Sequence, residues 1–295
     1  MAVLPGGAES PAFWGTRQSE LVLERMPSFS DPLKFSTAGA KLKELTVDLP
    51  ETETAVLGSD LNIYSQLSLQ GGVLQTKQHA LSLVGNRDGT AALAAGGGSV
   101  NGDISYRRRY HFDGSGWRLI SVPFDDVPFS SLQEPFHTQG GAWAEDVIED
   151  PGGSGPTSNL WFFDEDTQSY SGYYGDDSAF EPGNGYLFYM YADAPDGSSI
   201  LPADWQVSGD RPSERSVPLA YQTEGSTEYS LVGNPFAGAL DWQAVVGDNS
   251  KLGTCYAVWD PSMTESGGLE GFIYYNAADG VGGAGRYIAP MQGFL

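Results

Sequence analysis

Short apolar couplets recur along residues 39–100. In each couplet two apolar residues flank one other residue, the two-residue alternation of a strand that is buried on one face. The couplets are Leu45-x-Val47, Leu61-x-Ile63, Leu67-x-Leu69, Leu81-x-Leu83 and Ala91-x-Leu93. The first, second and fourth follow one another at near-even spacing, as the rungs of a β-solenoid do. We therefore predict a solenoid-like part here, with an ordinary antiparallel meander as the alternative.

After Gly98 the composition changes, and Trp, Tyr and Phe become dense between turn-forming residues. A helical stripe of useful length does not appear, although residues 241–246 favour one short helix with Asp241 as its N-cap. We predict an all-β chain in which a short β-solenoid-like part precedes a β-sandwich. The expected division is a lead-in at 1–38, solenoid-like repeats at 39–105 and an aromatic-rich sandwich at 106–295.

Three elements of the sandwich region recur in the same order further along the chain. Each set holds an aromatic-led strand ending at Pro-Phe, a strand closed by Asp, and a Pro-x-x-Gly turn that leads into an aromatic strand. The matched segments are 117–124 with 229–236, 160–164 with 256–260, and 181–187 with 289–295. We therefore predict an internal duplication with related halves at about 106–200 and 218–295, in which Trp117 and Tyr229 are counterparts.

The same segments carry a resemblance to a known family. They read GWRLISVP (116–123), LVGNPF followed by LDW (231–242) and IAPMQGF (288–294). Together they resemble the β-rich region that precedes the C-terminal sorting domain of bacterial surface proteins exported by the type IX system. The resemblance covers about residues 40–295 and implies an extracellular or cell-surface location. The chain departs from that pattern because it begins without a signal peptide and stops at Leu295, so we expect a fragment of a longer protein.

The charge balance excludes one class of function. The chain has 15 Lys and Arg against 38 Asp and Glu, a formal net charge of −23. Nucleic-acid binding requires clustered cations, and the only cluster is Arg107-Arg108-Arg109. No run of about 18 apolar residues occurs, so we expect no membrane insertion.

The residues that usually carry catalysis are few. With one cysteine, Cys255, and three histidines, the chain has no disulfide and no zinc constellation, and neither G-x-S-x-G nor H-E-x-x-H occurs. Residues 280–285 match G-x-G-x-x-G, but a strand-like segment ended by proline follows, so we predict a glycine loop rather than a nucleotide site. We expect His137 to lie in a loop and Cys255 to be a small buried residue. The chain is therefore expected not to be an enzyme and to hold no cofactor.

Two kinds of binding site stay open. Carboxylates are abundant and are typical of a solvated acidic surface, but Asp164, Asp166 and Asp176 could supply the oxygen ligands of a calcium ion. Most Trp and Tyr side chains are expected in the core, whereas Tyr173 and Tyr174 form the pair that we expect at a surface as a glycan-binding site.

These observations favour a non-catalytic structural or adhesive segment of a bacterial secreted or cell-surface protein. Its expected partners are glycans or other cell-surface molecules. A carbohydrate-binding module of a polysaccharide-degrading enzyme is the alternative, and a glycosidase with two facing carboxylates is a more distant one.

The acidic surface predicts a response to salt. If the charge of −23 suits a salt-rich habitat, added NaCl screens the self-repulsion of the folded chain, so its melting temperature should rise steeply with NaCl. Thermal unfolding followed by circular dichroism at increasing NaCl measures this. A flat melting temperature would contradict the habitat hypothesis.

Overall fold

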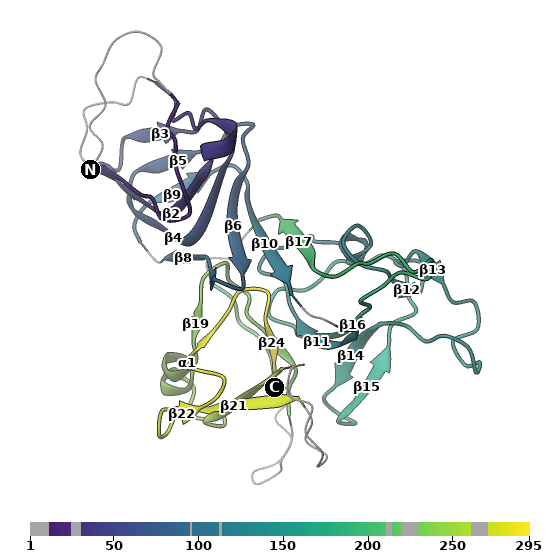
Figure 1. Cartoon of the computed structure of the whole chain (residues 1–295). Helices are drawn as coiled ribbons and strands as arrows, with labels where there is room; N and C mark the ends of the chain where they lie inside the picture. Colours follow the sequence, from purple (N-terminus) through teal and green to yellow (C-terminus); the bar gives the residue numbers. More distant parts are fainter. Residues whose placement is uncertain are drawn as a thin grey trace. The chain divides into compact units, whose positions relative to one another are not determined.

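The structure, a computed structural model, describes residues 12–24, 31–94, 96–111, 114–210, 214–219, 229–260 and 271–295. It is nearly all β, with 43% strand and 6% helix, which confirms the predicted fold class. The chain divides into two compact units (Figure 1). The first, called the solenoid unit, is Met1–Arg109 with Gln206–Gly209, and the second, called the repeat unit, is Tyr110–Trp205 with Asp210–Leu295. In the described ranges no helix is long and apolar enough to cross a membrane.

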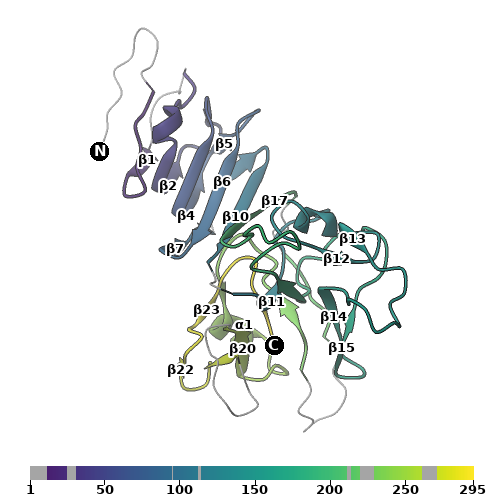
Figure 2. The same cartoon turned by 45° about the vertical axis from the view of Figure 1, so that its right-hand side comes forward.

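The solenoid unit is a β-solenoid of about four turns, with the main strands of successive turns side by side in parallel (Figure 2). The sheet order is β1-β2-β4-β6-β10-β17, and a second, parallel sheet has the order β3-β5-β9. The main strands of the turns are β1 (Glu20–Glu24), β2 (Lys41–Asp48), β4 (Leu61–Gly71), β6 (Leu81–Asn86) and β10 (Ile104–Tyr110). The last strand of the sheet is β17 (Ala203–Ser208), of which only Gln206–Ser208 belong to the solenoid unit. The other elements are η1 (Thr37–Gly39), β3 (Thr54–Val56), β5 (Val73–Gln75), β7 (Gly89–Thr90), β8 (Ala92–Ala94) and β9 (Ser99–Asn101).

The apolar couplets form the interior of the solenoid. Leu61 pairs with Leu81 and Ile63 pairs with Leu83 across β4 and β6. All four side chains are at most 1% exposed, because alternate residues of a strand point to the same face and each turn stacks its couplet on the next. The rung interpretation of these couplets is therefore confirmed.

The register of the first couplet differs from the prediction. The even spacing placed Leu45-x-Val47 on Leu61-x-Ile63, but Leu45 pairs with Leu67 and Val47 with Leu69. The reason is that β4 carries two couplets on one long strand, and β2 meets the second of them. A register shift between β2 and β4 separates the two levels.

The repeat unit holds several small sheets. The largest has the order β11-β16-β14-β15, and the others pair β12 with β13, β18 with β24, β19 with β23, and β20 with β21 and β22. The first half contains β11 (Gly116–Ile120), η2 (Phe129–Leu132), β12 (Gln139–Gly140), β13 (Asp146–Val147), β14 (Leu160–Asp164), β15 (Ser169–Gly172) and β16 (Tyr186–Met190). The second half contains β18 (Val232–Gly233), β19 (Leu240–Asp241), α1 (Trp242–Asp248), β20 (Cys255–Trp259), β21 (Phe272–Asn276), β22 (Val281–Gly282), β23 (Tyr287–Ile288) and β24 (Gly293–Phe294).

The short helix α1 forms where the sequence predicts it. Asp241 is its N-cap, and the carboxylate accepts a hydrogen bond from the backbone N–H of Gln243 at 3.2 Å. The guanidinium of Arg286 binds the same carboxylate, and this hydrogen bond lowers the pKa of Asp241. Arg286, the residue before β23, therefore holds the capping carboxylate in place together with the backbone N–H of the helix.

The two halves of the repeat unit share one strand pairing at their centres. In the first half, Ile120 of β11 pairs with Tyr186 of β16. In the second half, their sequence counterparts Val232 of β18 and Phe294 of β24 form the same antiparallel pair. The sequence repeat is therefore also a repeat of strand pairing.

A second pairing is repeated in the same way. Trp161 of β14 pairs with Leu187 of β16 in the first half. Their counterparts Ala257 and Leu295 exchange backbone hydrogen bonds of 2.8 and 2.9 Å in the second half. Each half also has a hairpin outside this pair, β14-β15 in one and β20-β21 in the other. The shared strand order confirms the internal duplication.

The duplication is not complete at its first aromatic residue. Trp117 lies in β11 and contacts Trp161 and Tyr189, whereas its predicted counterpart Tyr229 is 57% exposed and precedes β18. The expectation of equivalent surroundings is wrong here. The reason is that β18 has only two residues, so its ladder ends before it reaches Tyr229.

Aromatic side chains fill the core of each half. Phe129 contacts Trp143, Phe180 and Tyr186, with ring centroids 6.4, 4.7 and 5.9 Å away. In the second half, Trp242, Tyr256 and Phe294 form the corresponding cluster. The core positions predicted for tryptophan are confirmed at Trp143 and Trp205, both 0% exposed, and at Trp242, 7% exposed.

Two reciprocal bridges join the halves of the repeat unit. Ile120 of the first half pairs with Gln292 of the second, and Val232 of the second half pairs with Asn184 of the first. Ile120 and Val232 are sequence counterparts, and so are Asn184 and Gln292. We call these two bridges the lock. They are related to each other like the two equivalent contacts of a two-fold symmetric interface.

Glycine at two counterpart positions allows the lock to close. A Cβ on Gly185 would lie 2.6 Å from the carbonyl oxygen of Val232, and a Cβ on Gly293 would lie 2.8 Å from that of Ile120. Both distances are shorter than real Cβ contacts, and the colliding atom is backbone in each case. Glycine is therefore required where the main chains of the two halves approach each other.

We predict that Gly185→Ala lowers the free energy of unfolding of the repeat unit by about 1–3 kcal/mol, because the added methyl group forces the lock apart. Guanidinium unfolding followed by tryptophan fluorescence measures this, since six of the seven tryptophans lie in that unit. The matched control is Gly247→Ala in α1, where an added Cβ meets nothing within 4 Å. The control should gain about 0.5–1 kcal/mol from helix propensity, and equal effects of the two variants would contradict the role of Gly185.

Candidate functional site

One face of the β11-β16-β14-β15 sheet carries aromatic side chains outside the core. Tyr186, Phe188 and Met190 of β16 are at most 1% exposed and point into the core. Because successive side chains of a strand point to opposite faces, Tyr189 lies on the other face. The register places Trp117 of β11 directly opposite Tyr189.

Four of these side chains contact one another in a row. Tyr191 contacts Tyr189, Tyr189 contacts Trp117, and Trp117 contacts Trp161, with ring centroids 5.0, 5.2 and 5.6 Å apart. All three contacts are edge-to-face, the geometry that aromatic pairs favour. All four side chains are half-buried. Tyr191, Tyr189, Trp117 and Trp161 are here called the aromatic row.

Arg118 supports the row from within the repeat unit. Its side chain is buried, and its Nη1 donates a hydrogen bond of 2.6 Å to the backbone carbonyl of Trp117. Burial lowers the pKa of Arg118 to about 10, and the charge of Asp260 acts in the opposite direction. Arg118 therefore fixes the main chain that carries Trp117.

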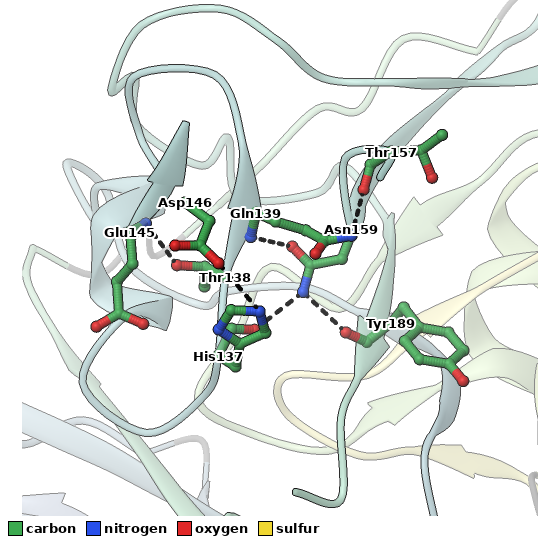
Figure 3. A network of polar contacts seen from close by, with 8 residues as sticks. All are labelled: His137, Thr138, Gln139, Glu145, Asp146, Thr157, Asn159 and Tyr189. Carbon is green, nitrogen blue, oxygen red and sulfur yellow. Dashed lines mark hydrogen bonds and ion pairs between the residues drawn. The ribbon is translucent and has the colours of Figure 1, made fainter. Parts of the chain in front are cut away.

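His137 extends the row at the end marked by Tyr191. The rings of His137 and Tyr191 lie 5.2 Å apart. Nε2 of His137 lies 3.6 Å from a carboxylate oxygen of Asp146 (Figure 3). The His137 side chain is only 11% exposed, whereas that of Asp146 is 64% exposed. Burial raises the pKa of Tyr191, so its hydroxyl stays neutral at physiological pH.

A buried asparagine holds this end together. The Nδ2 group of Asn159 donates to the carbonyl oxygens of His137 and Tyr189, both at 3.0 Å, and its Oδ1 accepts from the backbone N–H of Gln139 at 3.0 Å (Figure 3). Asn159 is 1% exposed. One amide therefore ties β16 to the loop that carries His137 and to β12.

The polar groups around His137 are also engaged in structure. The Thr138 hydroxyl accepts a hydrogen bond from the backbone N–H of Glu145, and the side chain of Gln139 donates to the carbonyl of Thr157 (Figure 3). Thr138 is fully buried. The indole N–H of Trp161 is engaged as well, since it donates to the carbonyl oxygen of Ser158 at 2.6 Å. What the arrangement offers to a ligand is therefore mainly a row of ring surfaces with the tyrosine hydroxyls along its edge.

The predicted calcium ligands occupy loops. Asp164 closes β14, and one of its carboxylate oxygens accepts from the backbone N–H of Thr167, which lowers the pKa of Asp164. Asp166 lies in the same turn, and Asp176 lies beyond β15. Within the described ranges, no three His, Cys, Asp or Glu side chains are grouped so that they could hold a metal ion. Calcium binding by these residues stays a prediction.

The predicted glycan pair is bound up in the fold. The Tyr173 ring packs against Phe129 and Phe162, and its hydroxyl donates to the carbonyl of Asp176 at 3.0 Å. The Tyr174 hydroxyl accepts from the backbone N–H of Ser158. Both side chains are half-buried. Glycan binding by Tyr173 and Tyr174 stays a prediction.

Three other sequence predictions meet different outcomes. His137 lies outside the helices and strands, as predicted. Residues 280–285 lead from β22 into the strand β23 instead of a helix, as the glycine-loop interpretation requires. Cys255, however, is exposed, and the prediction of a buried cysteine is wrong. The next residue, Tyr256, takes the core-facing position of β20, which turns Cys255 to the other face.

The sequence missed most of the aromatic row. The sequence predicts surface binding at Tyr173 and Tyr174, and it singles out neither Tyr189 nor Tyr191. The signal that could have found them is the alternation in 186–191, where buried and half-buried side chains follow each other. Only the register then brings Trp117 next to Tyr189.

Replacement of Asn159 tests how this end of the row is held. Asn159→Ala should lower the free energy of unfolding of the repeat unit by about 2–3 kcal/mol, because three half-buried backbone groups lose the hydrogen-bond partner that the buried Asn159 amide supplies. The control is Asn249→Ala, which removes one exposed side-chain bond to the carbonyl of Val245 and should cost less than about 1 kcal/mol. Denaturant unfolding measures both, and a cost for Asn159→Ala as small as that of the control would rule out this role.

The chain matches no protein-family model, no curated protein and no solved structure in the three comparisons made with it.

Proposed function

We propose that this chain is a non-catalytic structural and adhesive segment of a bacterial secreted or cell-surface protein, and that the aromatic row is its adhesive surface. The aromatic row is the observation that carries the proposal. The location outside the cell rests on the resemblance of residues 116–123, 231–242 and 288–294 to the region preceding a type IX sorting domain.

The row has the properties of a pre-organised binding surface. Its rings are held by edge-to-face contacts, by the strand pairing beneath Trp117 and by Asn159 at one end. Side chains that are already fixed lose little conformational entropy when a ligand binds. Tyr and Trp also combine an apolar ring with a polar edge, which suits ligands that have both kinds of surface.

Sugar rings fit that description, and they support a second candidate function. A pyranose has an apolar C–H face and a rim of hydroxyls, so it can stack on an indole or phenol ring while hydrogen bonding at the edge. The row has four rings in sequence, which favours an oligosaccharide over a single sugar. A carbohydrate-binding module attached to a polysaccharide-degrading enzyme would use the same surface.

Affinity electrophoresis in gels that contain xylan, mannan, pullulan or mixed-linkage β-glucan tests the ligand class. We expect at least one polysaccharide to retard the wild-type chain, and Trp117→Ala and Trp161→Ala each to weaken binding by about tenfold, or about 1.4 kcal/mol. Tyr274→Ala is the control, because Tyr274 is an exposed aromatic of β21 outside the row.

The outcomes test the surface that both candidates share. Retardation that the row variants lose and the control keeps supports glycan binding through the row. If no polysaccharide retards the wild-type chain, its adsorption to intact bacterial cells, compared with that of the same variants, tests the adhesive role. Equal adsorption of wild type and both tryptophan variants would refute the proposal that the row is the adhesive surface.

A further inference from the structure

The regular stacking of the solenoid is interrupted at one level of its main sheet. Leu42 of β2 pairs with Ile63 of β4, and the next pair is Glu44 with Gln66. One residue of β2, Lys43, therefore lies opposite two residues of β4. This is the residue count of a β-bulge, and bulges commonly re-aim side chains next to functional sites.

The neighbouring strand is interrupted at the same level. Strand β4 pairs with β6 as far as Ile63, which lies opposite Leu83, and from Gln66 onward it pairs with β8 instead. Between these two stretches the chain leaves the sheet as the β6-β7 hairpin, in which Asn86 pairs with Gly89. Tyr64 and Ser65 thus lie between the bulge on one side and the hairpin on the other.

A pocket occupies this interruption. Its volume is about 500 Å³, and it is lined by Tyr64 and Ser65, by Lys43 of the bulge, by the hairpin and by the turn that holds Arg17 and Gln18. Small-molecule sites commonly measure roughly 300–1,000 Å³. All of the lining residues belong to the solenoid unit, so this pocket is distinct from the aromatic row.

Both cations of the pocket already face carboxylates. Nζ of Lys43 lies 2.9 Å from a carboxylate oxygen of Glu20 and 3.0 Å from one of Glu44, and these contacts raise the pKa of Lys43. The guanidinium of Arg17 lies 4.7 Å from the centre of the Tyr64 ring and 3.8 Å from a carboxylate oxygen of Asp88. An anionic ligand would compete with these carboxylates and would meet a chain of charge −23.

The other lining groups are neutral and polar. Thr90 offers a hydroxyl, Gln18 and Asn86 offer amides, and Tyr64 offers an aromatic ring. The hydroxyl of Ser65 donates to a carboxylate oxygen of Glu44 at 3.5 Å and can still accept a hydrogen bond. The amide of Asn86 is oriented by the hairpin, because its Oδ1 accepts from the backbone N–H of Asp88 at 2.8 Å. Hydroxyls and amides that both donate and accept match a ligand rich in hydroxyl groups.

We propose that this pocket binds an uncharged sugar residue, held by the amides and hydroxyls of the lining and covered by the Arg17 side chain. The bulge and the hairpin open the space, and the paired charges leave it suited to a neutral polyol. The proposal concerns the solenoid unit alone, so it stands or falls separately from adhesion by the aromatic row.

Calorimetric titration and ¹H–¹⁵N NMR with glucose, galactose, mannose and N-acetylglucosamine at millimolar concentrations test it. We expect at least one of them to bind and to shift the amide resonances of Gly89 and Thr90. Glucuronate, an anion, and glucosamine, a cation, test whether the ligand must be uncharged. Both should bind more weakly than the neutral sugar that binds best. Thr90→Val should weaken binding by about fivefold, the effect of one lost hydrogen bond, whereas the control Thr46→Val on β2 should leave it unchanged.

Three results would overturn the proposal. One is that none of the neutral sugars shifts the Gly89 and Thr90 resonances. Another is that Thr90→Val, with an unchanged melting temperature, binds as tightly as the wild-type chain. The third is that glucosamine binds more tightly than every neutral sugar, which would assign the pocket to cations that replace Arg17 over Tyr64.

Discussion

Main-chain hydrogen bonding between the two halves holds the repeat unit together. The central strands of the second half, β18 and β24, have two residues each, and strands so short are not stable by themselves. Their backbone groups need partners, and the lock supplies some of them from the first half. The aromatic cluster around Trp242 includes Phe294 of β24, so its packing depends on this pairing. The close approach of the two main chains at the lock in turn depends on glycine at two counterpart positions.

Both candidate sites follow from strand register. On the sheet of the repeat unit, burial of Tyr186, Phe188 and Met190 leaves Tyr189 on the opposite face, so the core also fixes where the aromatic row lies. In the solenoid unit the pairing is irregular, and the pocket lies where the register of β2 and β4 shifts. One site is a surface that regular pairing produces, and the other is a pocket that a break in pairing produces.

The sequence predicted the features that depend on local pattern. The alternation of Leu61 with Ile63 and of Leu81 with Leu83 predicted strands of a solenoid, the echo predicted a duplicated unit, and the helix at Asp241 followed from capping chemistry. Features that depend on which strand meets which were predicted only where the repeat spacing is regular, as for Leu61 and Leu81. Leu45 pairs with Leu67 because β4 carries two couplets on one strand, and the spacing of the couplets does not indicate that they share a strand.

The candidate sites were harder to predict for the same reason. Tyr173 has the sequence context of a surface residue, yet its ring packs against Phe129 and Phe162, which are distant in sequence. Trp117 and Tyr189 became neighbours only through pairing of β11 with β16. The pocket beside Tyr64 has no motif, since its lining residues come from four separate segments that the stacking of turns brings together.

The reciprocity of the lock has a consequence for assembly. Each bridge of the lock is the counterpart of the other with the roles of the halves exchanged, so a second half from another copy would satisfy the same backbone groups. Two chains that traded second halves would keep all of these bonds in a domain-swapped dimer. Arg215 still binds the carboxylate of Asp125 in the first half, so the segment that crosses between copies would begin after Arg215. Its length and composition, and not the interface itself, would then decide between monomer and exchanged dimer.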